Sequence, residues 1–242
     1  MKKTIELFHK KKGKEKITML TCYDYSTAKF LNSSDIDAIL VGDSLGMVFQ
    51  GNNDTLPVTV DEMIYHAKAV RKGASDIFLV VDMPFLSYHT TTQDAILNCG
   101  RVIKESGANA VKIEGGEEII DKVKGLVAAK IPVMGHLGLT PQSVNVFGGF
   151  KVQGKNLQDA KRILHDALLL QEAGCFSVVL ECVPYKLAKL ITEKLAIPTI
   201  GIGSGNVTDG QVLVINDIMG MFDDVTPKFV KKFGNVSQEI KN

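Results

Sequence analysis

The sequence has few cysteines, little net charge and no long apolar run, and each shortage removes a class of protein. Its four cysteines are scattered, which argues against zinc-finger and paired-cysteine redox motifs and favours a reducing cytoplasmic compartment. A formal net charge of +1 offers no overall attraction for nucleic acid or an anionic membrane. No apolar stretch approaches the roughly 20 residues that cross a bilayer, and the basic start lacks a signal peptide's apolar region. We therefore expect a cytoplasmic protein with neither nucleic acid nor membrane as a partner.

The N-terminal segment is a local exception to this balance of charge. Seven lysines lie within the first 16 residues, and Ile5, Leu7 and Phe8 stand between them. Apolar residues interleaved with lysines are typical of an amphipathic helix with a solvated basic face. We expect such a helix ahead of the first strand.

Eight short apolar runs recur along the chain, and nearly continuous runs of this kind are typical of strands covered on both faces. They span residues 17–24, 38–44, 77–84, 110–115, 131–138, 176–182, 197–205 and 211–220. Segments of helical period separate them, which predicts one α/β domain over residues 1–242, a (β/α)8 TIM barrel. A doubly wound open sheet is the alternative, but it usually has fewer strands and a glycine fingerprint where Cys22–Tyr23–Asp24 stands.

Charged and polar residues cluster at the carboxyl ends of these predicted strands, where barrel enzymes place their chemistry. They are Asp43, Asp82, Lys112, Glu114, His136 and Glu181. Lys112 and Glu114 are two residues apart, so their side chains point to the same side of the strand. Four converging carboxylates would repel one another, and a divalent cation would relieve that repulsion. Oxygen ligands without a His/Cys cluster favour Mg²⁺.

Each of these residues also has a plain structural explanation. Asp43 and Asp82 are ordinary turn-forming types, Lys112 and Glu114 could pair at the barrel rim, and His136 could be a satisfied core histidine. Taken together, however, these explanations require several charged side chains to be buried independently in apolar strands. Each such burial costs folding free energy unless the charge is paired. We therefore favour a functional site.

The residue types also indicate a chemistry. A magnesium ion on Asp43 and Asp82 could chelate an α-keto acid and stabilise its enolate as a Lewis acid. Lys112 would balance the negative charge of the substrate, and Ser44 would donate a hydrogen bond to it. Glu181, across the barrel, is our candidate for the base. From the residues alone, the prediction reaches metal-assisted enolate chemistry and no further.

Several ordered motifs then resemble one family. They are VGDSLGMV, TLPVTVDEM, DMPFLSY, GANAVKIEGG, GHLGLTPQSVNVFGGFKVQGK, LECVP and IPTIGIGSGNVTDGQVLV, within residues 19–233. Together they resemble the ketopantoate hydroxymethyltransferases. The resemblance implies transfer of a one-carbon unit from 5,10-methylenetetrahydrofolate to 3-methyl-2-oxobutanoate, giving 2-dehydropantoate in the first step of pantothenate synthesis. It also implies a homo-oligomer, commonly a decamer. Family members usually continue with a further tail beyond the segment that here ends at Asn242.

The same resemblance assigns roles to the candidate residues. It makes Asp43 and Asp82 ligands of Mg²⁺ that also lie against the keto acid, with Glu114 completing the metal environment directly or through water. Ser44 and Lys112 would contact the keto acid, and His136 would line its pocket. Glu181 would be the proton acceptor. The segment 140–155 is a predicted lid and our candidate for part of the folate pocket.

Two other functions are compatible with parts of this pattern. The phosphoenolpyruvate mutase and isocitrate lyase group is similar in using a Mg²⁺ barrel for α-keto acid enolates, but its lyase branch has a lysine–cysteine–glycine–histidine loop. No cysteine here stands in that context. A non-catalytic barrel that binds a small acid is the other alternative, and such a scaffold has no need of charged groups inside.

Overall fold

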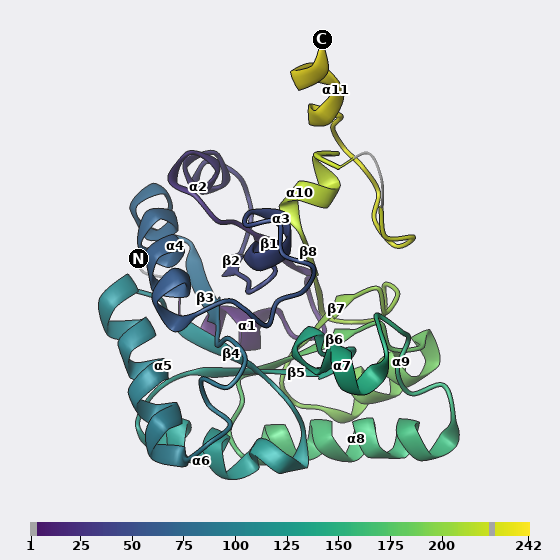
Figure 1. Cartoon of the computed structure of the whole chain (residues 1–242). Coiled ribbons are helices and arrows are strands. Elements are labelled where there is room, and N and C mark those ends of the chain that lie inside the picture. The colour runs from purple at the N-terminus through teal and green to yellow at the C-terminus, as the bar shows by residue number, and fades with distance from the viewer. Residues whose placement is uncertain (1–3, 223–225) are drawn as a thin grey trace.

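The computed structural model describes residues 4–222 and 226–242, and its centre is a closed barrel of eight parallel strands (Figure 1). The strands are β1 (Ile17–Thr21), β2 (Ala38–Val41), β3 (Phe78–Asp82), β4 (Ala110–Glu114), β5 (Val133–Gly138), β6 (Ser177–Glu181), β7 (Thr199–Ile202) and β8 (Gly210–Leu213). Each strand pairs with the next along the chain, and β8 closes the ring on β1, with Gly210 opposite Ile17. The predicted (β/α)8 barrel is confirmed, and the open sheet is excluded.

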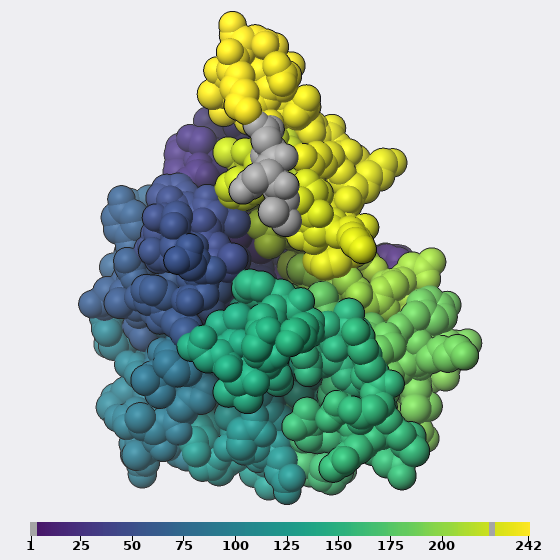
Figure 2. Space-filling view, turned by 45° about the vertical axis from the view of Figure 1, so that its right-hand side comes forward, coloured from purple at the N-terminus to yellow at the C-terminus, as the bar shows by residue number. Residues whose placement is uncertain are grey.

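Helices lie before, between and after the strands. They are α1 (Glu6–Lys11), α2 (Tyr25–Asn32), α3 (Leu45–Val48), α4 (Val60–Gly73), α5 (Thr92–Ser106), α6 (Ile120–Ala128), α7 (Val144–Phe147), α8 (Leu157–Glu172), α9 (Tyr185–Lys194), α10 (Ile215–Ile218) and α11 (Val236–Lys241), with 3-10 turns η1 (Glu117–Ile119) and η2 (Pro141–Ser143). A capping box between Thr59 and Glu62 starts α4, and Gly107 ends α5 in the left-handed conformation. α11 stands away from the barrel (Figures 1 and 2). No helix within the described ranges is long and apolar enough to span a bilayer.

Two apolar layers share the strands between them. Successive side chains of a strand point to opposite faces, so Ile39 and Leu79 join the buried helix residues in the outer layer. Their neighbours Leu40 and Val80 belong to a second cluster that fills the barrel interior. This alternation determines which residues reach the barrel axis, and therefore which polar groups lie inside.

The amino-terminal end of the barrel is closed by α1. The ring of Phe8 is fully buried, and its centroid lies 5.2 Å from that of Phe78 and 5.1 Å from that of Phe176, both in edge-to-face geometry. Such pairs add to the free energy gained by burying the rings. The predicted N-terminal helix is confirmed, but it is not merely a solvated surface helix.

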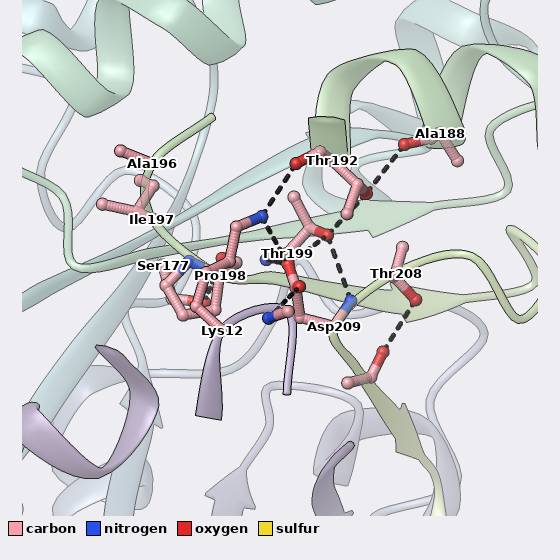
Figure 3. A network of polar contacts seen from close by, with 12 residues as sticks. Lys12, Ser177, Ala188, Thr192, Ala196, Ile197, Pro198, Thr199, Thr208 and Asp209 are labelled. Carbon is pink, nitrogen blue, oxygen red and sulfur yellow. Dashed lines mark hydrogen bonds and ion pairs between the residues drawn. The ribbon is translucent and has the colours of Figure 1, made fainter. Parts of the chain in front are cut away.

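Two lysines of the same segment are anchored to buried aspartates. Lys11 Nζ lies 2.7 Å from Asp37, ahead of β2, and Lys12 Nζ lies 2.7 Å from Asp209, ahead of β8. Figure 3 shows the second of these anchors, in which Asp209 also accepts hydrogen bonds from the backbone N–H groups of Gly13 and Thr199. Each buried carboxylate at this end therefore has a cation and backbone donors of its own.

Candidate active site

The strand alternation places five of the predicted residues at the carboxyl end of the barrel interior. Asp82 follows Phe78 and Val80 on the inward face of β3, while Lys112 and Glu114 continue the inward face of β4. His136 and Glu181 occupy the same layer on β5 and β6, where His136 Nε2 lies 3.2 Å from Glu181 Oε2. Residues from four different strands thus meet at one end of the barrel, as predicted.

Asp43 joins this group from the turn after β2. Its backbone N–H donates a hydrogen bond of 3.1 Å to Asp82 Oδ2, so the two aspartates are direct neighbours. Gly42 permits this close approach, because a Cβ there would lie 2.7 Å from Ser44 Oγ and 3.4 Å from Asp82 Oδ2. The glycine of the GDS sequence is therefore required for steric reasons. Asp43, which follows it, contacts Asp82 as well as forming the turn.

Lys112 is the cation of the cluster. Its Nζ lies 3.0 Å from Asp82 Oδ1 and 3.0 Å from His136 Nδ1. Burial by itself would lower the pKa of the ammonium, but Asp82, Glu114 and Asp43 outweigh burial and raise the pKa above its ordinary value. Lys112 is therefore held in its charged form at neutral pH.

His136 connects Lys112 to Glu181 as a neutral imidazole. Burial, followed by the charge of Lys112, lowers the pKa of His136. Since an ammonium can only donate, Nδ1 is the accepting nitrogen and the hydrogen is on Nε2, which faces Glu181 Oε2 at 3.2 Å. Glu114 Oε1 lies 3.3 Å from the Nδ1 side of the same ring. The ring therefore presents a donor to Glu181, whose side chain stays 17% exposed and accessible from outside.

The carboxylates of the cluster are not neutralised by one lysine. Burial, then the neighbouring Asp82 and Glu114, raises the pKa of Asp43 well above its usual range. Burial likewise raises the pKa of Asp82 despite Lys112, and raises that of Glu114 to about 7. The carboxyl group of each of these three residues is nearly inaccessible to solvent. The site therefore concentrates more negative charge than the protein itself compensates.

Two residues that sequence analysis did not single out complete the arrangement. Gln142, in η2, donates from its backbone N–H to Glu114 Oε2 (3.0 Å) and from Nε2 to Asp43 Oδ2 (2.8 Å). The Tyr88 hydroxyl accepts from the Glu114 backbone N–H at 3.0 Å and lies 3.1 Å from Gln142 Oε1. The only signal for Gln142 was its place in the segment 140–155, which also contains η2 and α7 and is therefore not wholly irregular.

Ser44 lies beside the cluster with a partner of its own. Its hydroxyl is 2.8 Å from the hydroxyl of Tyr23, and the backbone carbonyl of Tyr23 lies 2.7 Å from His66 Nδ1. Tyr23 is buried, and this burial raises the pKa of its phenol, so the phenol stays protonated at neutral pH. Ser44 is thus held in place next to Asp43, with a neutral neighbour.

The oxygen ligands at this end of the barrel suit a hard divalent cation. Across residues 4–222 and 226–242, no group of three or more His, Cys, Asp and Glu side chains forms a ready-made metal site. The adjacent Asp43 and Asp82 do fit Mg²⁺, which is commonly bound by one or two carboxylates with water and substrate completing its shell. Of the two oxygens of Glu114, Oε2 accepts a hydrogen bond from the Gln142 backbone N–H, whereas Oε1 faces the accepting Nδ1 of His136 and has no hydrogen-bond partner. Glu114 Oε1 is therefore open to a metal ion, directly or through water.

Comparison with known proteins identifies the family. The sequence matches the family described as ketopantoate hydroxymethyltransferase over residues 2–242. The chain belongs to this family. It is 59% identical over 242 residues to the 3-methyl-2-oxobutanoate hydroxymethyltransferase of Clostridium botulinum (strain Alaska E43 / Type E3), covering 100% of this chain and 88% of that protein. The enzyme of the same name from Clostridium acetobutylicum is 56% identical with the same coverage. This ketopantoate hydroxymethyltransferase family member is therefore an enzyme, a transferase.

Solved structures with the same fold are much more distant in sequence. A phosphonomutase-like protein from Burkholderia cenocepacia J2315 aligns with a TM-score of 0.67 at 12% identity, covering 86% of this chain and 90% of that one. A 2,3-dimethylmalate lyase of the PEP mutase/isocitrate lyase superfamily aligns with a TM-score of 0.62 at 14% identity, covering 88% and 81%. At such identities the likeness shows the barrel fold alone, whereas the family match separates this enzyme from the lyase alternative.

Proposed function

We propose that this enzyme transfers a hydroxymethyl group from 5,10-methylenetetrahydrofolate to 3-methyl-2-oxobutanoate, giving 2-dehydropantoate and tetrahydrofolate, with Mg²⁺ as its metal. The transfer is the first step of pantothenate synthesis. The observation that supports it best is the adjacent, buried pair Asp43 and Asp82 beside a charged Lys112, within a chain of this family. Excess negative charge that a cation would relieve is the requirement for such a site.

Each residue then has a role that follows from its surroundings. Asp43 and Asp82 would hold the magnesium ion and lie against the keto acid, and Glu114 would complete the metal environment directly or through water. A magnesium ion bound there would polarise the keto group and stabilise the negative charge that develops on it. Lys112, which stays protonated, would attract the substrate carboxylate, and Ser44 would donate a hydrogen bond to it.

The proton at C3 of the keto acid must be removed before a new carbon–carbon bond can form. Glu181 would accept that proton, since its side chain is partly accessible and one of its oxygens lies 3.2 Å from His136 Nε2. His136 would line the pocket as a neutral donor and would not compete for the proton, because its pKa is lowered by burial and by Lys112. The segment 140–155 is our candidate for part of the folate pocket.

The deciding experiment measures exchange of the C3 proton of 3-methyl-2-oxobutanoate with deuterium from solvent, with Mg²⁺ present or with a chelator. We expect exchange only with the metal, and 2-dehydropantoate only when 5,10-methylenetetrahydrofolate is added. Exchange that is unaffected by the chelator would refute the metal role. Absence of product under all conditions would refute the transfer.

We also propose that the protein acts in the cytoplasm as a homo-oligomer, with a decamer expected from the family resemblance. Large aromatic side chains are exposed on the adjacent helices α2 and α4 of the isolated chain, with Phe30 75% and Tyr65 73% exposed. Exposed apolar side chains of this size are typical of a surface that another subunit covers. Light scattering would measure the mass directly, and a monomer mass would contradict this proposal.

A further inference from the structure

Gln142 stands out because its backbone N–H and both polar atoms of its side chain are directed at the carboxylate cluster or at the residues that surround it. Its backbone N–H donates to Glu114 Oε2 at 3.0 Å. Its side-chain nitrogen lies 2.8 Å from Asp43 Oδ2 and 2.8 Å from the Met83 carbonyl. The side chain is nearly inaccessible to solvent. A buried amide with partners on every side has little freedom to reorient.

The chemistry of these partners determines how the amide is oriented. The Met83 carbonyl can only accept a hydrogen bond, so the group that faces it must be the NH₂ of Gln142. The second hydrogen of the same NH₂ then points at Asp43 Oδ2. The amide oxygen is left to face the Tyr88 hydroxyl at 3.1 Å. Gln142 therefore donates to Asp43 through its side-chain NH₂.

The position of Gln142 in the chain adds a second consequence. Asp43 follows β2 and Glu114 ends β4, whereas Gln142 belongs to η2 after β5. Gln142 thus links the carboxylates of Asp43 and Glu114, which come from separate strands, to the segment that follows β5. Hydrogen bonds from such outer partners fix the direction of carboxylate lone pairs and determine how well a metal is bound.

We propose that Gln142 is a positioning residue for the metal carboxylates: it holds Asp43 and Glu114 in the geometry that binds the divalent cation. This inference rests on the proposed function, because it assumes that Asp43 is a metal ligand. Gln142 touches neither the reacting atoms nor the ion. Its effect is transmitted through the orientation of Asp43 Oδ2 and Glu114 Oε2.

The test is a titration of the full-length protein with Mn²⁺, followed by electron paramagnetic resonance, with Mg²⁺ as competitor and no substrate present. Gln142→Met keeps the length of the side chain and removes its donor to Asp43, while the backbone N–H that donates to Glu114 remains. We expect the dissociation constant for Mn²⁺ to rise about 10- to 100-fold. Gln142→Glu places a carboxylate oxygen opposite Asp43 Oδ2 and adds a negative charge, so it should weaken Mn²⁺ binding at least as much. Gln93→Met, at an exposed position in the first turn of α5, is the matched control and should bind as wild type does.

Exchange kinetics provide a second measurement that separates positioning from general damage. For Gln142→Met, the Mg²⁺ concentration needed for half-maximal exchange should rise by the same factor as the dissociation constant. The rate at saturating Mg²⁺ should recover to within a few fold of wild type. If Gln142→Met does not fold by circular dichroism, Gln142→Asn, which retains the amide on a shorter chain, takes its place with the same expectation for metal affinity.

The outcomes are distinct. An unchanged Mn²⁺ affinity in Gln142→Met, or in Gln142→Asn where that variant replaces it, together with normal metal-dependent exchange in wild type, would overturn the role of Gln142 and leave the proposed function intact. Wild-type protein that binds no Mn²⁺ and exchanges the proton without metal would overturn both. Weaker binding in the Gln142 variant with unaltered binding in Gln93→Met would support the inference.

Discussion

The two ends of the barrel treat buried charge in opposite ways. At the amino-terminal end, Asp37 is paired with Lys11 and Asp209 with Lys12. Each of these carboxylates also accepts a hydrogen bond from a backbone N–H. At the carboxyl end, Lys112 is the one ammonium in a cluster that also contains the carboxylates of Asp43, Asp82, Glu114 and Glu181.

This contrast shows what distinguishes a stabilising end from a reactive one. Where each aspartate has a cation, charge and hydrogen bonds are balanced and the apolar rings around Phe8 close the barrel. Where carboxylates exceed cations, burial raises the pKa of Asp43 and Asp82. Such a cluster costs folding free energy, which the binding of a cation would recover. We therefore expect substitutions at the carboxyl end to affect activity and substitutions at the amino-terminal end to affect stability.

The largest expected effect is that of Asp43→Ala at the carboxyl end. Removing a proposed metal ligand should lower Mg²⁺-dependent C3 exchange by more than about 100-fold, since loss of an outer partner alone can cost that much. The protein should still fold, because the substitution also removes a repulsive buried charge. Exchange is measured by proton resonance in deuterated buffer, and near-normal exchange would contradict the assignment. Asp209→Ala serves as the comparison: it should lower stability and leave exchange per folded molecule unchanged.

Glu181→Gln should lower the exchange rate by about 10²- to 10⁴-fold, the usual contribution of a general base. Binding of Mn²⁺ and of 3-methyl-2-oxobutanoate should stay close to wild type, because the amide has the shape of the carboxylate it replaces. Titration calorimetry measures this binding. If the variant exchanges at the wild-type rate, the proton goes to another group or to water.

Phe8→Ala should lower the free energy of unfolding by about 3–5 kcal/mol, as for other large buried aromatic residues. Phe8 is fully buried against Phe78 and Phe176 at the amino-terminal end. Denaturant unfolding measures the change, and exchange per folded molecule should not differ from wild type. Leu97→Ala, at a residue of α5 that is 66% exposed, is the control and should change stability by less than about 0.5 kcal/mol. A loss of activity in folded Phe8→Ala would show that the two ends are coupled.

Lys12→Met should have the smallest of these effects, about 1–3 kcal/mol of lost stability. The substitution leaves the Asp209 carboxylate buried with its backbone donors but without its cation. The matched control on the same segment is Lys10→Met, since Lys10 pairs with Glu6 at 3.5 Å on the exposed surface and such pairs contribute little. Equal changes in thermal midpoint for the two variants would show that the buried Lys12–Asp209 pair contributes no more to stability than the exposed Lys10–Glu6 pair.

Much of this architecture could be predicted from local patterns. Apolar runs at regular spacing indicate parallel strands because such strands are buried on both faces. Each of the eight predicted runs overlaps a strand of the barrel, although the last run, 211–220, also includes the helix α10. Within a strand, the two-residue period places Lys112 and Glu114 on one face whatever the rest of the chain does. The position of Asp82 and Glu181 at strand ends likewise follows from where the apolar runs stop.

Other features depended on the closed barrel. The amphipathic pattern of the first helix does not show that Phe8 enters the barrel, because the rings of Phe78 and Phe176 are brought to it only by the closure of the sheet. Gln142 is one polar residue in a connecting segment, and nothing in its neighbours specifies Asp43, 99 positions away, as its partner. The sequence by itself determined the strands, their inward faces and the residue types at their ends, since these depend on local periodicity. Only the tertiary structure decided which carboxylates share a cation and which polar group orients them, because contacts between distant segments exist only once the barrel has closed.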